Sequence, residues 1–492
     1  MRRLVAALPI PLLCLSGTLR AQQCPDGSPP PCGRPQAHAP SVAILFTEPR
    51  SRNAADSLLA EGLTLEIINT LSGVARLDVR SRWVSRRIAA DADPMRSAWA
   101  LGVDYLVDGV LELDSARVLV RGALTRTSTG RLVRPLRIER RRAEIEGLQA
   151  AVAQEVAAAV IGRLLPAERA RFAVRRVDPR VTELLLSARA LRQQYTPATL
   201  LQARALVQQS IAIDSTYAPA WVELCLCYSW LSDFEPTAVP QLPMAASERT
   251  FGRQSREAGE RAFALDSTNG TAMSIIAGGR ASRNDLSPRT EALARAGAAR
   301  EPNVETIMGL TAVLIDMGQS EEALAVLREA ARRDSLSPAI WTASAYRLFN
   351  ARHFAESGGA WERALALRPS AQDSVKLRLD RRWARLETGD CAGSLADGRS
   401  AGDTLLIIES LRCLTRTVEA DSIADSQLAI PTIPPTLRAT LLAWRSQPDS
   451  AFAVLDRAYP RRLGLVIQHP AFDPYRRHPA YLALRRRMGL EQ

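Results

Sequence analysis

The second half of the chain is built on an internal period. From Val181 onward the pattern is helix after helix, and the ends of four successive helical units are evenly spaced by about 34 residues. These ends are Asp266, Arg300, Asp334 and Arg368. A small residue recurs at one fixed place before them, at Ala262, Ala296, Ala330 and Ala364. Because stacked helical repeats bury their apolar faces only against one another, this period predicts an all-α solenoid.

The residues within each period resemble the tetratricopeptide-repeat family. Trp221, Leu224 and Tyr228 match the first-helix signature, and Trp341 takes the place of Trp221 in a later unit. Ala203 and Ala323 fill the small position of the second helix, and Asp-Ser pairs at 214, 266 and 334 end helices. The resemblance implies a solenoid over residues 181–433, with a Pro-containing insertion at 231–250. Residues 434–492 are predicted to form an irregular helical C-terminal cap.

Residues 41–165 have the pattern of a small α/β domain. A continuous apolar run, Val42–Phe46, is typical of a strand covered on both faces. Further strands are predicted at 75–81, 105–113, 117–125 and 132–138, and helices at 54–71, 94–101 and 146–165. The predicted fold is therefore multidomain: a small α/β domain with a mixed sheet in two or three layers, followed by an all-α tetratricopeptide-repeat solenoid.

Four segments of this first domain resemble the TolB-like (FlgO-like) N-terminal domain family. They are Ser41–Phe46, Ala60–Thr64, Ala100–Gly109 and Thr129-Gly130, in the order and spacing of that family. The loop at 47–53 departs from the family, which usually has a polar Gly/Asp-containing segment there. The family brings no catalytic residues, so the resemblance implies a binding or interaction domain.

The N-terminus predicts export. Met1-Arg2-Arg3 is a short positive region, and Leu4–Leu15 is an apolar stretch of signal-peptide length. We therefore expect a signal peptide at 1–21, a Pro-rich tether at 22–40, and a periplasmic or secreted mature protein. A linker is expected at 166–180. No segment is apolar for long enough to predict a stable membrane span.

The net charge of +12 does not by itself indicate nucleic-acid binding. The positive charge is almost entirely arginine, with Lys376 as the single lysine, and the arginines are interleaved with acids. The densest cluster, Arg137, Arg140, Arg141 and Arg142, lies where a strand passes into a helix. A solvated face is the expected reading, and no nucleic-acid partner is predicted.

The cysteines suggest two disulfides. Cys24 and Cys32 bracket a Pro-rich run, where a disulfide is expected and a metal knuckle is the alternative. Cys391 lies on a second helix and Cys413 on the next first helix, so these thiols form either a bridge or a pair of buried free thiols. Cys225 and Cys227 are predicted to be small packing residues of the repeat core, because two positions apart they point to different helix faces.

The sequence contains no catalytic, cofactor-binding or metal-binding constellation, and a non-enzymatic protein without cofactors is predicted. Two function classes remain. In the first, the solenoid is a scaffold that binds a protein or peptide in the cell envelope through a concave groove. Its candidate residues, which flank the repeat tryptophans, are Glu223, Thr342 and Arg347. In the second, the α/β domain is an envelope sensory or ligand-binding module.

Overall fold

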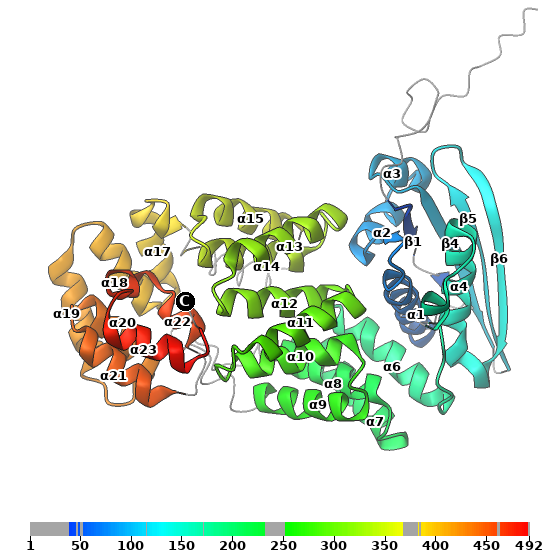
Figure 1. Cartoon of the computed structure of the whole chain (residues 1–492). Coiled ribbons are helices and arrows are strands. Elements are labelled where there is room, and N and C mark those ends of the chain that lie inside the picture. The colour runs from blue at the N-terminus through cyan, green and yellow to red at the C-terminus, as the bar shows by residue number, and fades with distance from the viewer. Residues whose placement is uncertain are drawn as a thin grey trace, which may run out of the picture.

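The computed structural model describes residues 39–45, 48–49, 53–114, 116–170, 172–231, 251–367, 382, 385–459 and 463–490. Figure 1 shows a sheet-containing domain at one end and a row of paired helices that extends from it. The expected signal peptide, nearly all of the tether with Cys24 and Cys32, and all but the first residue of the 231–250 insertion lie outside the described residues.

The first domain contains a mixed six-stranded sheet. Its strands are β1 (Ser41–Ile44), β2 (Glu48–Pro49), β3 (Asp78–Val79), β4 (Tyr105–Leu113), β5 (Arg117–Arg126) and β6 (Arg131–Arg141). The order is β3-β1-β4-β5-β6, with β2 paired to β4. β1 runs parallel to β3 and β4, whereas β4, β5 and β6 form an antiparallel meander. The sheet is thus parallel at one edge and antiparallel at the other.

Helices cover both faces of the parallel part of the sheet. They are α1 (Ala54–Ser72), α2 (Arg82–Ala89), α3 (Pro94–Ala100), η1 (Arg142–Gly147) and α4 (Leu148–Ile161). Val42 and Ile44 of β1 point into a core shared with α1 and α4, and Ala43 points into a second core with α2 and α3. This division follows from the alternation of side chains along a strand. The α/β domain therefore has three layers over β1 and β4.

Two elements of this domain were not predicted. β2 is only two residues long, and α2 carries four polar or charged residues among eight. Ser81 caps α2 by accepting hydrogen bonds from the Trp83 and Val84 amides. Only Val84 and Ile88 of α2 join the apolar core. The helix is amphipathic, but it is shorter than the window of about 11–18 residues over which a helical period is recognised in a sequence.

In the described residues that follow the α/β domain, the regular elements are all helices. The helices of the repeat array are α6 (Pro179–Arg192), α7 (Pro197–Ile213), α8 (Ala218–Leu231), α9 (Phe251–Leu265), α10 (Gly270–Ala281), α11 (Pro288–Arg300), α12 (Val304–Asp316), α13 (Ser320–Arg333), α14 (Pro338–Asn350), α15 (Phe354–Leu367), α17 (Cys391–Ala401), α18 (Thr404–Cys413) and α19 (Thr417–Leu428). They stack as antiparallel pairs (Figure 1), and most connections are short, the exceptions being 232–250 between α8 and α9 and 368–390 between α15 and α17. The protein is therefore a small mixed α/β domain followed by an all-α solenoid.

Equivalent repeat positions make equivalent contacts. The indole Nε1 of Trp221 donates to the Ser215 carbonyl at 3.0 Å, and that of Trp341 donates to the Ser335 carbonyl at 2.8 Å. Ala262, Ala330 and Ala364 are buried, as the period predicts. The prediction is wrong at Ala296, which is exposed.

The neighbouring Gly297 takes the buried place in α11. A Cβ atom on Gly297 would lie 2.6 Å from the Gly270 carbonyl oxygen, so α10 and α11 approach too closely there for an alanine.

The C-terminal region packs back onto the middle of the solenoid. It comprises α20 (Pro435–Trp444), α21 (Pro448–Ala458), α22 (Gly464–Ile467), η4 (Pro470–Tyr475) and α23 (Pro479–Arg487). Phe472 is fully buried in a core that also holds Leu286 and Val313 of the α10–α12 region. Asn284 accepts a hydrogen bond from the Leu463 amide at 2.9 Å. The expected cap at 434–492 is thus one more helix pair followed by an irregular tail.

The structure joins Cys391 and Cys413 in a disulfide. Cys391 begins α17 and Cys413 ends α18, and in an antiparallel pair these two ends meet. Their Cα atoms are 5.9 Å apart, inside the range that a disulfide requires.

Candidate functional site

The α/β domain docks directly on the solenoid. Gly62 of α1 lies against α6, and a Cβ atom there would be 2.1 Å from the Leu186 carbonyl oxygen. The expected linker at 166–180 includes α5 (Pro166–Ala170), whose Glu168 pairs with Arg76 at 2.6 Å. Backbones this close leave no room for a flexible joint, so the two domains form one packed body along α1 and α6.

A second contact uses the connection between α13 and α14. Arg80 donates to the Arg333 carbonyl at 3.1 Å, and Leu336 packs on the core formed by α2 and α3. Asp334 is 7 % exposed there, and burial raises the pKa of its carboxyl to about 6.

Asp214 and Asp266 occupy the equivalent repeat position. Their carboxylates accept hydrogen bonds from the backbone amides of Thr216 and Thr268, within their own turns. The third Asp-Ser turn is thus adapted to hold the α/β domain.

Glu223 does not line an open groove. It is 2 % exposed and forms an ion pair with Arg192 of α6, which is 5 % exposed. Arg189 pairs with Glu223 at 3.4 Å and also with Glu66 of α1. The sequence places Glu223 beside the repeat tryptophan, but the partner arginines come from another helix. The predicted groove residue is therefore part of a buried ionic network.

The electrostatics of that network are strongly coupled. Burial by itself lowers the pKa of Arg192, but the carboxylates of Glu223 and Glu305 outweigh burial and raise it. Arg82 of α2 donates to the Gln193 carbonyl at 3.0 Å, and burial lowers its pKa to about 9. A partner peptide could reach these charges only if the α/β domain moved away.

The other two predicted groove residues lie far along the array from Glu223. Thr342 and Arg347 are both half-buried on α14, three first helices beyond α8. Five positions apart on one helix, they also face different directions. The structure therefore does not bring Glu223, Thr342 and Arg347 into one site.

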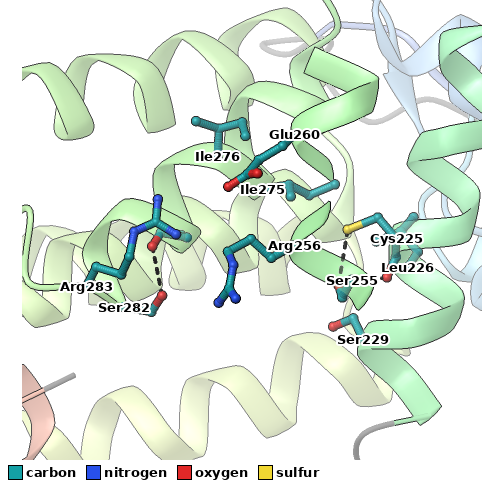
Figure 2. A pocket seen from close by; sticks show the side chains of 12 residues that line it. Cys225, Leu226, Ser229, Ser255, Arg256, Glu260, Ile275, Ile276, Ser282 and Arg283 are labelled. Atoms are coloured by element: carbon teal, nitrogen blue, oxygen red, sulfur yellow. Dashed lines mark hydrogen bonds between the residues drawn. The ribbon is translucent and has the colours of Figure 1, made fainter. Parts of the chain in front are cut away.

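A different site is present between α8, α9 and α10. A cavity of about 260 Å³ is lined by Cys225, Leu226, Ser229, Ser255, Arg256, Glu260, Ile275, Ile276, Gly278, Gly279, Ser282 and Arg283. Figure 2 shows its wall, with apolar side chains from α8 and α10 and charged side chains from α9 and from the end of α10. The lining combines apolar side chains with a few polar and charged groups, as ligand-binding pockets commonly do.

At this cavity two consecutive residues of α10 carry no side chain. Gly278 and Gly279 stand next to each other inside the helix, and a Cβ atom at either would meet nothing within 4 Å. Each interior helical glycine costs about 0.5–1 kcal/mol relative to alanine. Since packing does not require them, these glycines leave a strip that another backbone can approach.

The cysteines near the cavity are unreactive packing residues. Both Cys225 and Cys227 are buried and free. The Cys225 sulfur lies 3.2 Å from the Ser255 hydroxyl, and burial raises the pKa of the thiol to about 11. Cys227 is buried in the same repeat core, and because the two cysteines are two positions apart on α8 their thiols point to different sides of the helix.

Sequence reasoning missed this cavity. Its lining residues come from three helices and share no motif. The Gly278-Gly279 pair inside a helix was not a specific signal, because α15 contains a second such pair, Gly358-Gly359, with equally open surroundings away from the cavity. Within the described ranges, no His, Cys, Asp and Glu side chains gather as a metal site. No helix among the described residues has both the length and the apolarity needed to cross a bilayer.

Comparison with known proteins gives a distant relative in sequence. No family model matches the chain. "Putative adenylate cyclase 3" of Rhizobium meliloti (strain 1021) is 28% identical over 219 residues. The match covers 44% of this chain and 36% of that protein, so the chain spans about a third of the relative.

Similar solved structures are helical-repeat proteins. Human IFIT1, in a dimer with m7Gppp-AAAA, has a TM-score of 0.40 and 10% identity, over 84% of this chain and 97% of that one. Pseudomonas aeruginosa PilF has a TM-score of 0.30 and 14% identity, over 46% and 94%. YrrB, "a TPR protein with an unusual peptide-binding site", has a TM-score of 0.24 and 12% identity, over 40% and 90%. At these scores the assignment of a repeat solenoid rests on this chain's own helix pairs and equivalent contacts.

Proposed function

We propose that this chain is a non-enzymatic interaction protein whose solenoid binds a peptide or protein partner in the cell envelope. The observation that carries the proposal is the cavity between α8, α9 and α10, with the bare backbone at Gly278 and Gly279. An extended segment can approach such a strip closely and gain van der Waals contact with the helix. The named activity of the putative adenylate cyclase is not part of the proposal, because the match spans only 36% of that protein.

The proposal also places the protein outside the cytoplasm. Met1-Arg2-Arg3 and the apolar Leu4–Leu15 support a signal peptide. The Cys391–Cys413 disulfide supports an oxidising compartment. We also propose that residues 41–165 are a TolB-like domain, whose role here is to hold the start of the solenoid through α1 and α6.

The second candidate is a sensory module that binds a ligand through the α/β domain. A shallow hollow there is lined by Arg117, Glu139, Arg140, Arg141 and Glu144. Arg117 pairs with Glu139 at 3.2 Å, and Arg141 pairs with Glu144. Arg140, the third arginine of the hollow, donates to the Glu139 carbonyl at 2.9 Å. Because all three guanidinium groups already have partners, the hollow has less to offer a ligand than the solenoid cavity has.

Filling the cavity should abolish peptide binding without unfolding the protein. We expect wild-type protein to select specific sequences from a randomised library of short displayed peptides, and Gly279→Leu to select none of them. The leucine side chain enters open space, and replacing a helical glycine favours α10, so the helix content should be unchanged by circular dichroism.

The matched control is Gly359→Leu. Gly359 is a helical glycine of α15 with the same open surroundings, but it lies away from the cavity. We expect this variant to select the same peptides as the wild type. Equal selection by all three proteins would remove the cavity as the binding site. A wild type that selects no peptide would refute the proposed function.

Export should leave the C-terminal cysteines oxidised in cells. When thiols are blocked at lysis, peptide mapping of the envelope or secreted fraction should find Cys391 linked to Cys413. It should also find Cys225 and Cys227 unlinked, because burial keeps both thiols protonated. Protein found in the cytoplasmic fraction, with Cys391 and Cys413 alkylated and the N-terminus uncut, would contradict export.

A further inference from the structure

The charges around the solenoid cavity are unbalanced. Arg256 of α9 and Arg283, just beyond α10, contribute two guanidinium groups, and Glu260 contributes one carboxylate. Within the described part of the chain neither guanidinium forms an ion pair or a hydrogen bond. Some nearby arginines differ: Arg253 lies 4.0 Å from Glu257, and Arg295 pairs with both Glu291 and Glu322. What sets Arg256 and Arg283 apart is that they line the cavity.

Interaction with a helix dipole is a simpler explanation for an arginine that has no ion-pair partner, and the position of each arginine tests it. Arg283 follows the C-terminal end of α10, where the helix dipole by itself favours a cation. That explanation does not apply to Arg256, which lies in the N-terminal half of α9. Figure 2 shows Arg256 in the middle of the cavity wall, between Glu260 and Ser229. A guanidinium held there contributes most when an anion enters the cavity.

Other groups on the wall suit a carboxylate that belongs to a peptide. Ile275 and Ile276 offer apolar contact on α10, beside the bare backbone of Gly278 and Gly279. The Ser282 hydroxyl, which donates to the Gly279 carbonyl at 2.8 Å, keeps lone pairs that can accept a hydrogen bond from a ligand amide. A polyphosphate backbone would instead require a continuous basic track, and Glu260 interrupts it.

Resting on the proposed function, we propose that the cavity selects an extended peptide segment carrying a carboxylate, which binds between Arg256 and Arg283. The carboxylate belongs to an Asp or Glu side chain or to a free C-terminus. Neighbouring apolar side chains of the segment lie on Ile275 and Ile276, and its backbone lies along the glycine strip. The ionic contact supplies selectivity, and the apolar and backbone contacts supply the rest of the affinity.

The test uses full-length protein and labelled short peptides in matched sets. The first set carries Asp and Glu side chains and an amidated C-terminus. The second set is neutral: it has Asn and Gln in place of Asp and Glu, and its C-terminus is also amidated. The third set has the same Asn and Gln side chains but a free C-terminal carboxylate. We expect the wild type to bind one of the two carboxylate sets at least about tenfold more tightly than the neutral amidated set, since hydrogen bonds to charged groups are the stronger ones. Which of the two binds identifies the source of the carboxylate.

Arg256→Gln should remove that preference and leave binding of the neutral set unchanged. Arg253→Gln is the matched control, because Arg253 is an exposed arginine of the same helix that already has Glu257 as a partner. If Gly279→Leu abolishes binding but Arg256→Gln does not change the preference, the proposed function stands and the carboxylate assignment is wrong. If no set binds the wild type, both are wrong. Tighter, Arg256-dependent binding of a single-stranded oligonucleotide would also overturn the assignment.

Discussion

Replacing Glu223 by alanine should destabilise the protein by about 3 kcal/mol or more, because it leaves the buried charge of Arg192 without its nearest partner. Glu305 still lies 3.5 Å from Arg192, which keeps the expected loss toward the lower end of the usual range of about 3–5 kcal/mol. Denaturant unfolding followed by circular dichroism measures the change in the free energy of unfolding.

Two further variants separate a lost ion pair from a merely lost side chain. In the double variant Arg192→Met with Glu223→Leu neither charge remains buried, so stability should recover most of the loss. Glu257→Ala removes one partner of an exposed pair and should change stability by less than about 0.5 kcal/mol. A loss below about 1 kcal/mol for Glu223→Ala would mean that water reaches Arg192 and that the network is not closed.

The fate of Glu223 shows where sequence reasoning stops. The pattern around Trp221 locates the helix correctly, but it cannot tell a solvated acid from a paired one. The partners Arg189 and Arg192 lie on α6, and Glu66 lies on α1. Burial of a charge depends on which distant elements pack together, and no local period records that. The prediction of Glu223 as a groove residue is wrong for this reason.

Elements with a strong local pattern were predicted well. β4 has the predicted bounds, Tyr105–Leu113, because an apolar run there follows a turn at Gly102. α1 begins at Ala54 as predicted, where Asn53 accepts a hydrogen bond from the Ala55 amide. The repeat helices share this advantage, since each unit repeats the same packing positions. α2 is too short and too polar for its pattern to be recognised, and it is one of the elements that carry the α/β domain onto the solenoid.

The cavity and the C-terminal tail illustrate the same limit on a larger scale. The cavity wall joins α8 to α10 across the 232–250 region, so its residues are not neighbours in sequence. The irregular cap was predicted from its composition. Its packing against α10 and α12 could not be predicted, because the contact between Leu463 and Asn284 spans 179 residues. Only a three-dimensional arrangement brings these groups together.

Phe472→Ala should destabilise the protein by about 3–5 kcal/mol, the usual cost of removing a fully buried aromatic side chain. Phe472 packs near Phe452 of α21, with ring centroids 5.8 Å apart, in the core that joins the tail to the α10–α12 region. Denaturant unfolding measures the loss, and amide hydrogen exchange locates it. Leu482→Ala is the control on α23, because Leu482 is 42% exposed and its truncation should be nearly neutral.

The expected hydrogen-exchange pattern tells whether the tail at 463–490 stabilises the middle of the solenoid or only packs on its surface. Because Leu286, Val313 and Phe472 share one core, exchange in Phe472→Ala should rise in residues 463–490 and also at the ends of α10 and α12. The Gln468 side chain donates to the Ile315 carbonyl at 2.9 Å, and this bond should be lost with the tail. If exchange rises in 463–490 alone, the tail is held by α20 and α21, and the middle of the solenoid is stable without it.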